Sequence, residues 1–110
     1  MITELDVERA VDYLRDNARK AGHAKAERIY MEEYRKTVKA QIMAERNNLK
    51  LGEQEREAYA DPRYIQHLQA MREAVEADEY HRWMMVSAQA KIECWRTQQA
   101  NARAEGKAYS

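Results

Sequence analysis

The feature that most constrains the fold is a long stretch without a helix breaker, which begins at Asp61-Pro62. No Gly and no second Pro occurs after this dipeptide until Gly106. Asp is a favoured helix N-cap and Pro a favoured first helical residue, so the dipeptide predicts a helix start. We expect one helix over residues 62–104, about 64 Å long at 1.5 Å per residue. Because a compact chain of this size is only about 35 Å across, the sequence predicts an elongated protomer.

The composition favours helices in the rest of the chain as well. The chain has 110 residues, of which 45% are hydrophobic and 35% charged, with three Gly, one Pro and no Phe. The abundant residue types, which include Ala, Glu, Arg, Lys and Gln, are good helix formers. No segment alternates polar and apolar residues for long enough to predict a strand. We expect a single all-α domain over residues 1–110.

Local signals predict two more helices. Thr3 and Asp6 approximate a capping box and predict a first helix over residues 4–20. Gly22 predicts a break at residues 21–23, with a nearly continuous helix through this point as the alternative. The second helix, over 24–46, should end at Asn47-Asn48.

A loop is expected over 47–61, in which 53–60 could add a turn or two of helix, and a flexible tail over 105–110. Together these elements predict an elongated helical hairpin of residues 24–46 and 62–104, with an additional N-terminal helix.

Apolar residues mark the faces that these helices should bury. One face of the 24–46 helix carries Ala24, Met31, Tyr34, Val38 and Ile42. The 62–104 helix carries two stripes about a third of a turn apart: first Tyr64, Ile65, Leu68, Met71 and Val75, and then Met85, Ala88, Ile92 and Trp95. Two faces predict two partners, of which the second is the N-terminal helix or another copy of the chain. We expect a homo-oligomer, with the second stripe at its interface.

A basic stripe lies beside the apolar face of the 24–46 helix. Its cations fall within about a third of the circumference: Lys25, Arg28, Arg35, Lys36, Lys39 and Arg46. The formal net charge is zero, but residues 24–51 are net +3 and residues 52–82 net −4. Such a stripe could track a phosphate backbone, with exposed Tyr30 available to stack on bases. Alternatively, it is a solvated face whose cations pair with glutamates such as Glu32.

Residues with catalytic or metal-binding chemistry are scattered. His67 and His81 would lie about 21 Å apart on a straight helix, too far to share a metal ion. Cys94 is the only cysteine, so it can form no internal disulfide, and no nucleophile elbow or phosphate loop is present. We expect a protein that is not an enzyme and holds no metal or cofactor. Trp83 and Trp95 belong to apolar clusters and should pack at a helix interface.

Nothing in the sequence predicts a membrane protein. The longest uncharged run, residues 83–90, is too short to span a bilayer, and the charged N-terminus does not resemble a signal peptide. A lone cysteine fits a reducing compartment. We expect a soluble, cytoplasmic protein.

Two short elements resemble the UvsY-type recombination mediators of large tailed phages. The first is Val38-Lys39-Ala40-Gln41-Ile42, where that family tends to have Lys-Ala-Arg-Leu, and the second is Ile92-Glu93-Cys94-Trp95-Arg96. An acidic loop and a long helix that begins near an Asp separate them, as in the family. The chain also has the general look of many small phage-encoded helical proteins.

The resemblance covers about residues 25–104. It implies a homo-oligomer that binds single-stranded DNA and acts in recombination in the cytoplasm of an infected host cell, with a recombinase, an annealing protein or a single-strand-binding protein as its protein partner. Gln41 then joins the predicted DNA-binding residues Lys25, Arg28, Arg35, Lys36, Lys39 and Arg46. The alternative function is a structural or adaptor oligomer that binds only protein, its basic stripe pairing with the acidic residues 73–79 of a neighbouring copy.

Overall fold

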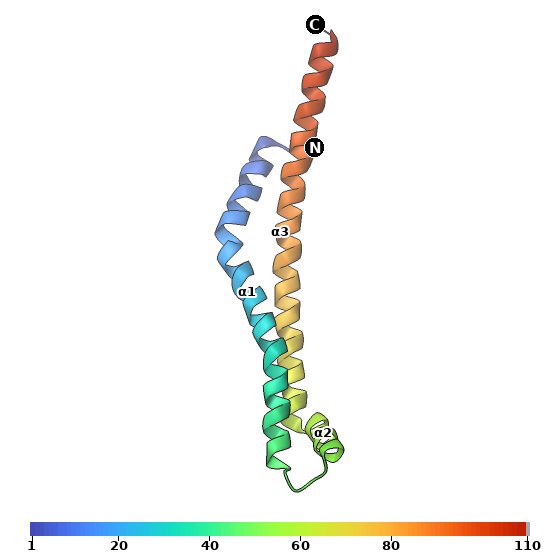
Figure 1. Cartoon of the computed structure of the whole chain (residues 1–110). Coiled ribbons are helices and arrows are strands. Elements are labelled where there is room, and N and C mark those ends of the chain that lie inside the picture. Colours follow the sequence, from blue (N-terminus) through green and yellow to red (C-terminus); the bar gives the residue numbers. More distant parts are fainter. Residues whose placement is uncertain (110) are drawn as a thin grey trace. The chain divides into compact units, whose positions relative to one another are not determined.

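The computed structural model describes residues 1–109, and this part of the chain contains three helices and no strand. They are α1 (Glu4–Glu45), α2 (Leu51–Ala60) and α3 (Pro62–Tyr109) (Figure 1). The predicted all-α class is therefore confirmed. The boundaries differ from the predicted ones at three places.

The first difference is that α1 is continuous through Gly22. The capping box is present: the Thr3 N–H donates to the Asp6 carboxylate at 2.9 Å, and the Asp6 N–H to the Thr3 hydroxyl at 3.2 Å. The predicted break at 21–23 is wrong and the alternative of a continuous helix is confirmed, because no glycine among the described residues adopts a positive φ. A glycine without that conformation weakens a helix by roughly 0.5–1 kcal/mol but does not end it.

The second difference lies in the predicted loop. The chain turns at Asn47-Asn48 as expected, but without a left-handed residue: the N–H of Leu49 donates to the carbonyl of Arg46 at 3.0 Å. The predicted loop over 47–61 is then mostly α2. The Gln54 side chain donates to the Leu49 carbonyl at 2.9 Å, which gives this carbonyl, in the turn before α2, a hydrogen-bond partner.

The third difference is the length of the last helix. Asp61 caps α3 as predicted, since its carboxylate accepts the Arg63 N–H at 2.8 Å, with Pro62 as the first helical residue. The helix does not stop at residue 104 but continues through Gly106 to Tyr109. Residue 110, the end of the predicted tail, lies outside the described residues.

Contacts divide the chain into two compact units, where the sequence predicted one domain. We call them the α2 unit, Gly22–Glu79, and the terminal unit, which contains Met1–Ala21 and α3 from Tyr80 onward. Each unit pairs a segment of α1 with a segment of α3.

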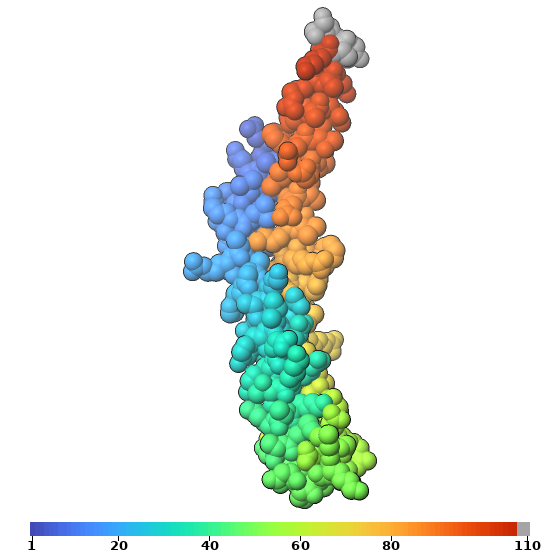
Figure 2. Space-filling model, in the orientation of Figure 1, coloured from blue at the N-terminus to red at the C-terminus, as the bar shows by residue number. Residues whose placement is uncertain are grey.

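The α2 unit contains the larger core. Ile42 is 1% exposed and packs with Ala58 of α2 and Tyr64 of α3, against half-buried Val38 and Met43. In the space-filling view, the light green residues of α2 lie against the green end of α1 (Figure 2). Most of the predicted apolar face of residues 24–42 is confirmed by this packing, although Tyr34 remains exposed.

In the terminal unit, α1 and α3 pack against each other through small side chains. Ala10 of α1 and Ala88 of α3 are both buried, and with Tyr13 and Met84 they line one shallow pocket. Small residues let two helices approach closely but bury little apolar area. This unit therefore has a thin core.

Most covered positions of α3 follow a heptad pattern in both units. They alternate at spacings of three and four: Tyr64, His67, Met71, Ala74, Asp78, His81, Met85, Ala88, Ile92 and Trp95. Ala70, Val75, Glu79 and Gln98 are also half-buried but stand outside this series. Such spacing is typical of an a/d seam. The predicted stripe was therefore wrong for Ile65 and Leu68, which are exposed, and it missed His67, Asp78 and His81 because they are polar.

Candidate nucleic-acid interface

The structure separates the predicted basic stripe into two groups. Arg28, Lys39 and Arg46 are half-buried and paired with acids of other elements, whereas Lys25, Arg35, Lys36 and the neighbouring Gln41 are exposed. The first group holds helices together. Only the second group is presented to solvent.

Arg28 joins α1 to α3. Its guanidinium donates to the buried carboxylate of Asp78, and also to Glu32 one turn along α1, at 3.1 Å. The hydrogen bond to Asp78, followed by that to Glu32, raises the pKa of Arg28 above its ordinary value. Removing either partner of such a pair leaves the other charge partly buried and uncompensated, so we assign Arg28 to the scaffold.

Lys39 joins α1 to α2. Its ammonium donates to the Tyr59 hydroxyl at 2.8 Å and to Glu55 at 3.0 Å, and it lies 4.7 Å from the centre of the Tyr59 ring. The hydrogen bond to Tyr59, followed by that to Glu55, raises the pKa of Lys39 above its ordinary value. The Lys39 ammonium is therefore already bound to side chains of α2.

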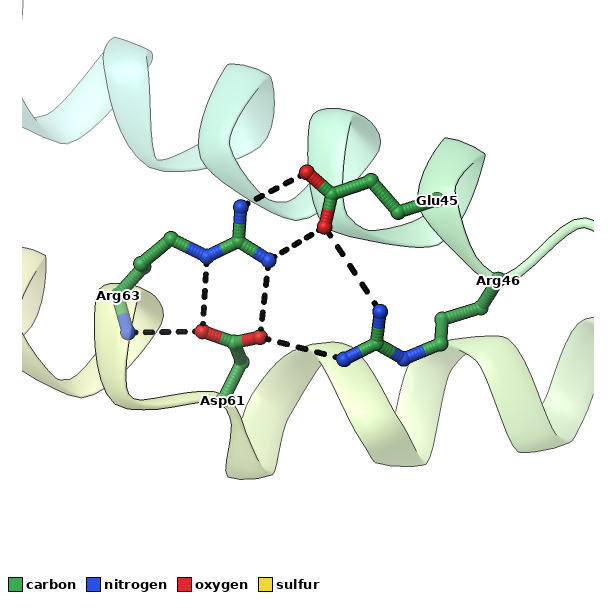
Figure 3. Close-up of polar contacts among 4 residues, drawn as sticks. All are labelled: Glu45, Arg46, Asp61 and Arg63. Atoms are coloured by element: carbon green, nitrogen blue, oxygen red, sulfur yellow. Dashed lines mark hydrogen bonds and ion pairs between the residues drawn. The ribbon is translucent and has the colours of Figure 1, made fainter.

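Arg46 belongs to a cluster of four charged residues, Glu45, Arg46, Asp61 and Arg63, which we call the Arg63 cluster (Figure 3). Arg63 donates to both carboxylate oxygens of Glu45, at 2.8 and 2.5 Å, and to both of Asp61, at 3.1 and 3.0 Å. Arg46 lies 3.6 Å from Asp61 and 3.7 Å from Glu45. The cluster connects the end of α1 to the junction of α2 and α3.

Each guanidinium stabilises the charged form of the carboxylates. The hydrogen bond from Arg63 holds the pKa of Glu45 below its ordinary value, and hydrogen bonds from the Arg63 side chain and backbone do the same for the pKa of Asp61. The same bonds raise the pKa of Arg63.

Lys25, Arg35 and Lys36 are exposed side chains of α1. Lys25 and Arg35 make no ion pair within residues 1–109. Lys36 pairs with Glu33 on the same helix at 3.1 Å, and both side chains are about 70% exposed. Such a pair is weak, so these three cations are available to an anionic partner.

An aromatic pair borders this surface. The rings of Tyr30 and Tyr34 stack with centroids 5.6 Å apart and an interplanar angle of 15°. They line a shallow groove of about 380 Å³ together with Glu33, Lys36 and Thr37. Tyr30 was expected to be exposed, and it is. The spacing of four residues between two aromatics on one helix was the signal for the stack.

The predicted oligomer interface is partly covered within the chain. Ala88 is 6% exposed and lies in the pocket that Ala10 lines, while Met85, Ile92 and Trp95 are half-buried. An interface between copies through these residues stays a prediction. The packing of Trp95 agrees with the sequence, but Trp83 is 58% exposed, so its predicted burial was wrong.

Two further observations concern metal ions and membranes. Within residues 1–109, no group of three or more His, Cys, Asp or Glu side chains is arranged to hold a metal ion. None of the helices in this range has an apolar stretch of the length that a membrane span requires.

No protein-family model, curated protein or solved structure matches the chain. The resemblance to UvsY-type mediators therefore stays a prediction, carried by its two short elements.

Proposed function

We propose that the chain is a non-enzymatic accessory protein that binds single-stranded DNA through the outer side of α1 in the α2 unit. One observation carries this proposal: Lys25, Arg35 and Lys36 are presented to solvent along one helix, beside exposed aromatic rings. Phosphate contacts by such cations supply affinity that does not depend on sequence, and aromatic rings suit unpaired bases.

The paired cations support this role indirectly. Arg28, Lys39 and Arg46 fix α1 to the other two helices, so the exposed cations project from a scaffold and not from an isolated helix. A surface on a rigid element loses less conformational entropy when it binds. The proposed DNA-binding set is accordingly smaller than the sequence predicted, and consists of Lys25, Arg35, Lys36 and Gln41.

Three cations in one protomer make a weak site, so the proposal includes a homo-oligomer. Several such sites acting together raise the apparent affinity through effective concentration. Ile29, Ile65 and Leu68 of the α2 unit are exposed, and contact between copies would remove their apolar surface from water. The resemblance to UvsY-type mediators adds the setting: phage recombination, with a recombinase, an annealing protein or a single-strand-binding protein as partner.

Binding of a mixed-sequence single-stranded oligonucleotide, measured by fluorescence anisotropy across a range of salt concentrations, tests the proposal. We expect the double variant Lys25→Ala with Lys36→Ala to weaken binding and to reduce the log–log salt slope by about 1.4, since each lost phosphate contact removes about 0.7. Glu33→Gln should strengthen binding, because it releases Lys36.

The matched control removes the same charge elsewhere in the α2 unit. Lys50 and Arg56 are exposed in or next to α2, so Lys50→Ala with Arg56→Ala should leave binding nearly unchanged. An equal loss in both double variants would show only general attraction to positive charge. Wild-type protein that binds no oligonucleotide at low salt would reject the proposal.

The internal pairing of Arg28, Lys39 and Arg46 favours a second candidate, an adaptor oligomer that binds only protein. In that case the exposed cations would pair with the acidic residues 73–79 of a neighbouring copy. Light scattering separates the two: the Lys25→Ala, Lys36→Ala variant should then lower the oligomer mass toward the 13.0 kDa of one chain, while DNA has no effect on wild-type protein.

A further inference from the structure

We infer that the Tyr30–Tyr34 pair is a stacking site for unpaired nucleobases. This inference rests on the proposed function and deepens it, because it assigns the base contact to one residue, Tyr30, and the support of its ring to Tyr34 and His67. The ligand would be a single strand of any sequence, since every base has a flat π-face.

The pair is held in place by α3. Tyr34 lies between Tyr30, at 5.6 Å between ring centroids, and the His67 ring of α3, at 5.7 Å. The Nε2 atom of His67 lies 2.7 Å from the carbonyl oxygen of Met31, within hydrogen-bond distance. His67 therefore supports one side of Tyr34, and Tyr34 supports one face of Tyr30.

The other face of Tyr30 is open. This side chain is 60% exposed, although it belongs to a stacked pair. Helical side chains lean toward the N-terminus, so the neighbours on the open side are the residues four and three positions earlier, Ala26 and Glu27. Ala26 is small, and both side chains are exposed. A flat ligand placed on Tyr30 would thus extend an existing stack over Ala26.

Cations lie where a sugar-phosphate backbone would follow such a base. At 100° per residue, Lys25 and Lys36 lie about a third of the circumference from Tyr30, both on the same side. The groove that Tyr30 lines is also lined by Lys36 and Thr37. The exposed side of α1 therefore has an aromatic edge and a cationic edge, which matches a ligand with a flat base and a charged backbone.

The polar lining of the groove favours a nucleotide over a protein side chain. Protein interfaces place their aromatic anchors in a core that is depleted of charged residues. Here Glu33 and Lys36 lie in the same groove as the aromatic pair, and both are exposed. A polynucleotide, whose bases and phosphates alternate, fits this mixture better.

An oligonucleotide without bases isolates the stacking contribution. We compare anisotropy titrations of a fluorescent mixed-sequence strand and of an abasic strand with the same number of phosphates. Tyr30→Ala should weaken binding of the base-containing strand about fivefold to 150-fold, since one base–aromatic stack is worth roughly 1–3 kcal/mol. Binding of the abasic strand should not change. Tyr30→Phe keeps the ring and should retain wild-type affinity for both strands.

Tyr80→Ala is the matched control, because Tyr80 is also 60% exposed but lies in the terminal unit, edge-on to His81. It should change neither affinity.

The inference is overturned, with the proposed function intact, if wild-type protein binds both strands equally well and Tyr30→Ala has no effect. An equal loss for both strands, or a fall in oligomer mass in Tyr30→Ala, would instead assign Tyr30 to structure or to contact between copies. No binding of either strand by wild-type protein rejects the proposed function itself.

Discussion

The α2 unit and the terminal unit use the same two long helices but hold them together differently. In the α2 unit, ion pairs cross between elements: Arg28 joins α1 to α3, Lys39 joins α1 to α2, and the Arg63 cluster connects all three helices. The ion pairs of Arg15 and Arg96 in the terminal unit each lie within one helix. There the helices meet through Ala10 and Ala88.

The polar groups of the seam differ in the same way. His67 in the α2 unit lies within hydrogen-bond distance of the Met31 carbonyl, whereas the buried Nδ1 of His81 in the terminal unit has no partner within residues 1–109. An unsatisfied buried polar atom costs stability. The helices of the α2 unit are therefore held together by more specific polar contacts than those of the terminal unit. The α2 unit also carries the proposed binding surface.

The largest expected effect is on the core of the α2 unit. Ile42→Ala should lower the free energy of unfolding by about 2–5 kcal/mol, because it leaves a cavity between Ala58 and Tyr64. Urea denaturation followed by circular dichroism measures this change. Ile65→Ala, at an exposed isoleucine, is the control and should cost no more than about 0.5 kcal/mol. Equal losses would mean that Ile65 is also covered, which points to an interface between copies.

A smaller effect is expected from acid. Because the pKa values of Glu45 and Asp61 are lowered from ordinary values of 4.5 and 3.8, both carboxylates contribute stability that is fully present above those values. The contribution is lost as the pH falls below about 4, through the folded-state pKa values. The urea midpoint should therefore fall between pH 5 and pH 3, less steeply in a variant with Glu45→Gln and Asp61→Asn.

Hydrogen exchange locates this acid effect. Amides of α2 should lose protection in acid first, because the Arg63 cluster connects α2 to its neighbours. The terminal unit has one comparable group: hydrogen bonds from the backbone and side chain of Thr3 lower the pKa of Asp6. Asp6→Asn should alter only the first turn of α1. Earlier loss of protection around Ala10 than in α2 as the pH falls would contradict the assignment of the acid effect to the Arg63 cluster.

The sequence predicted what local signals determine. The caps at Thr3 and Asp61 and the turn at Asn47-Asn48 depend on residues close in the chain, and all three were found. The seam of α3 was only partly predicted, because His67, Asp78 and His81 occupy positions where a search for apolar periodicity expects apolar side chains. The burial of Asp78 and His67 depends on partners in α1 that are distant in sequence, Arg28 for Asp78 and the Met31 carbonyl for His67.

Contacts between residues that are distant in sequence also explain why the proposed binding site has fewer residues than the sequence predicted. A helical wheel places Lys36, Lys39 and Arg46 in one stripe, but it carries no information on α2, whose Glu55 and Tyr59 occupy Lys39. Because residues 47–61 were predicted to form a loop, the sequence analysis did not include α2, the helix that supplies these partners. The Tyr30–Tyr34 stack needed only one helix, and its spacing was visible in the sequence.

The smallest expected effect concerns Gly22, the first residue of the α2 unit. It lies inside α1 without a positive φ, and a Cβ added there would meet no other atom within 4 Å. Gly22→Ala should therefore raise the free energy of unfolding by roughly 0.5–1 kcal/mol, because alanine loses less backbone entropy in a helix. Thermal denaturation and far-ultraviolet circular dichroism measure the gain. If instead this variant is less stable, α1 does not pass through residue 22 as a regular helix, and the break first read from the sequence would be the better description.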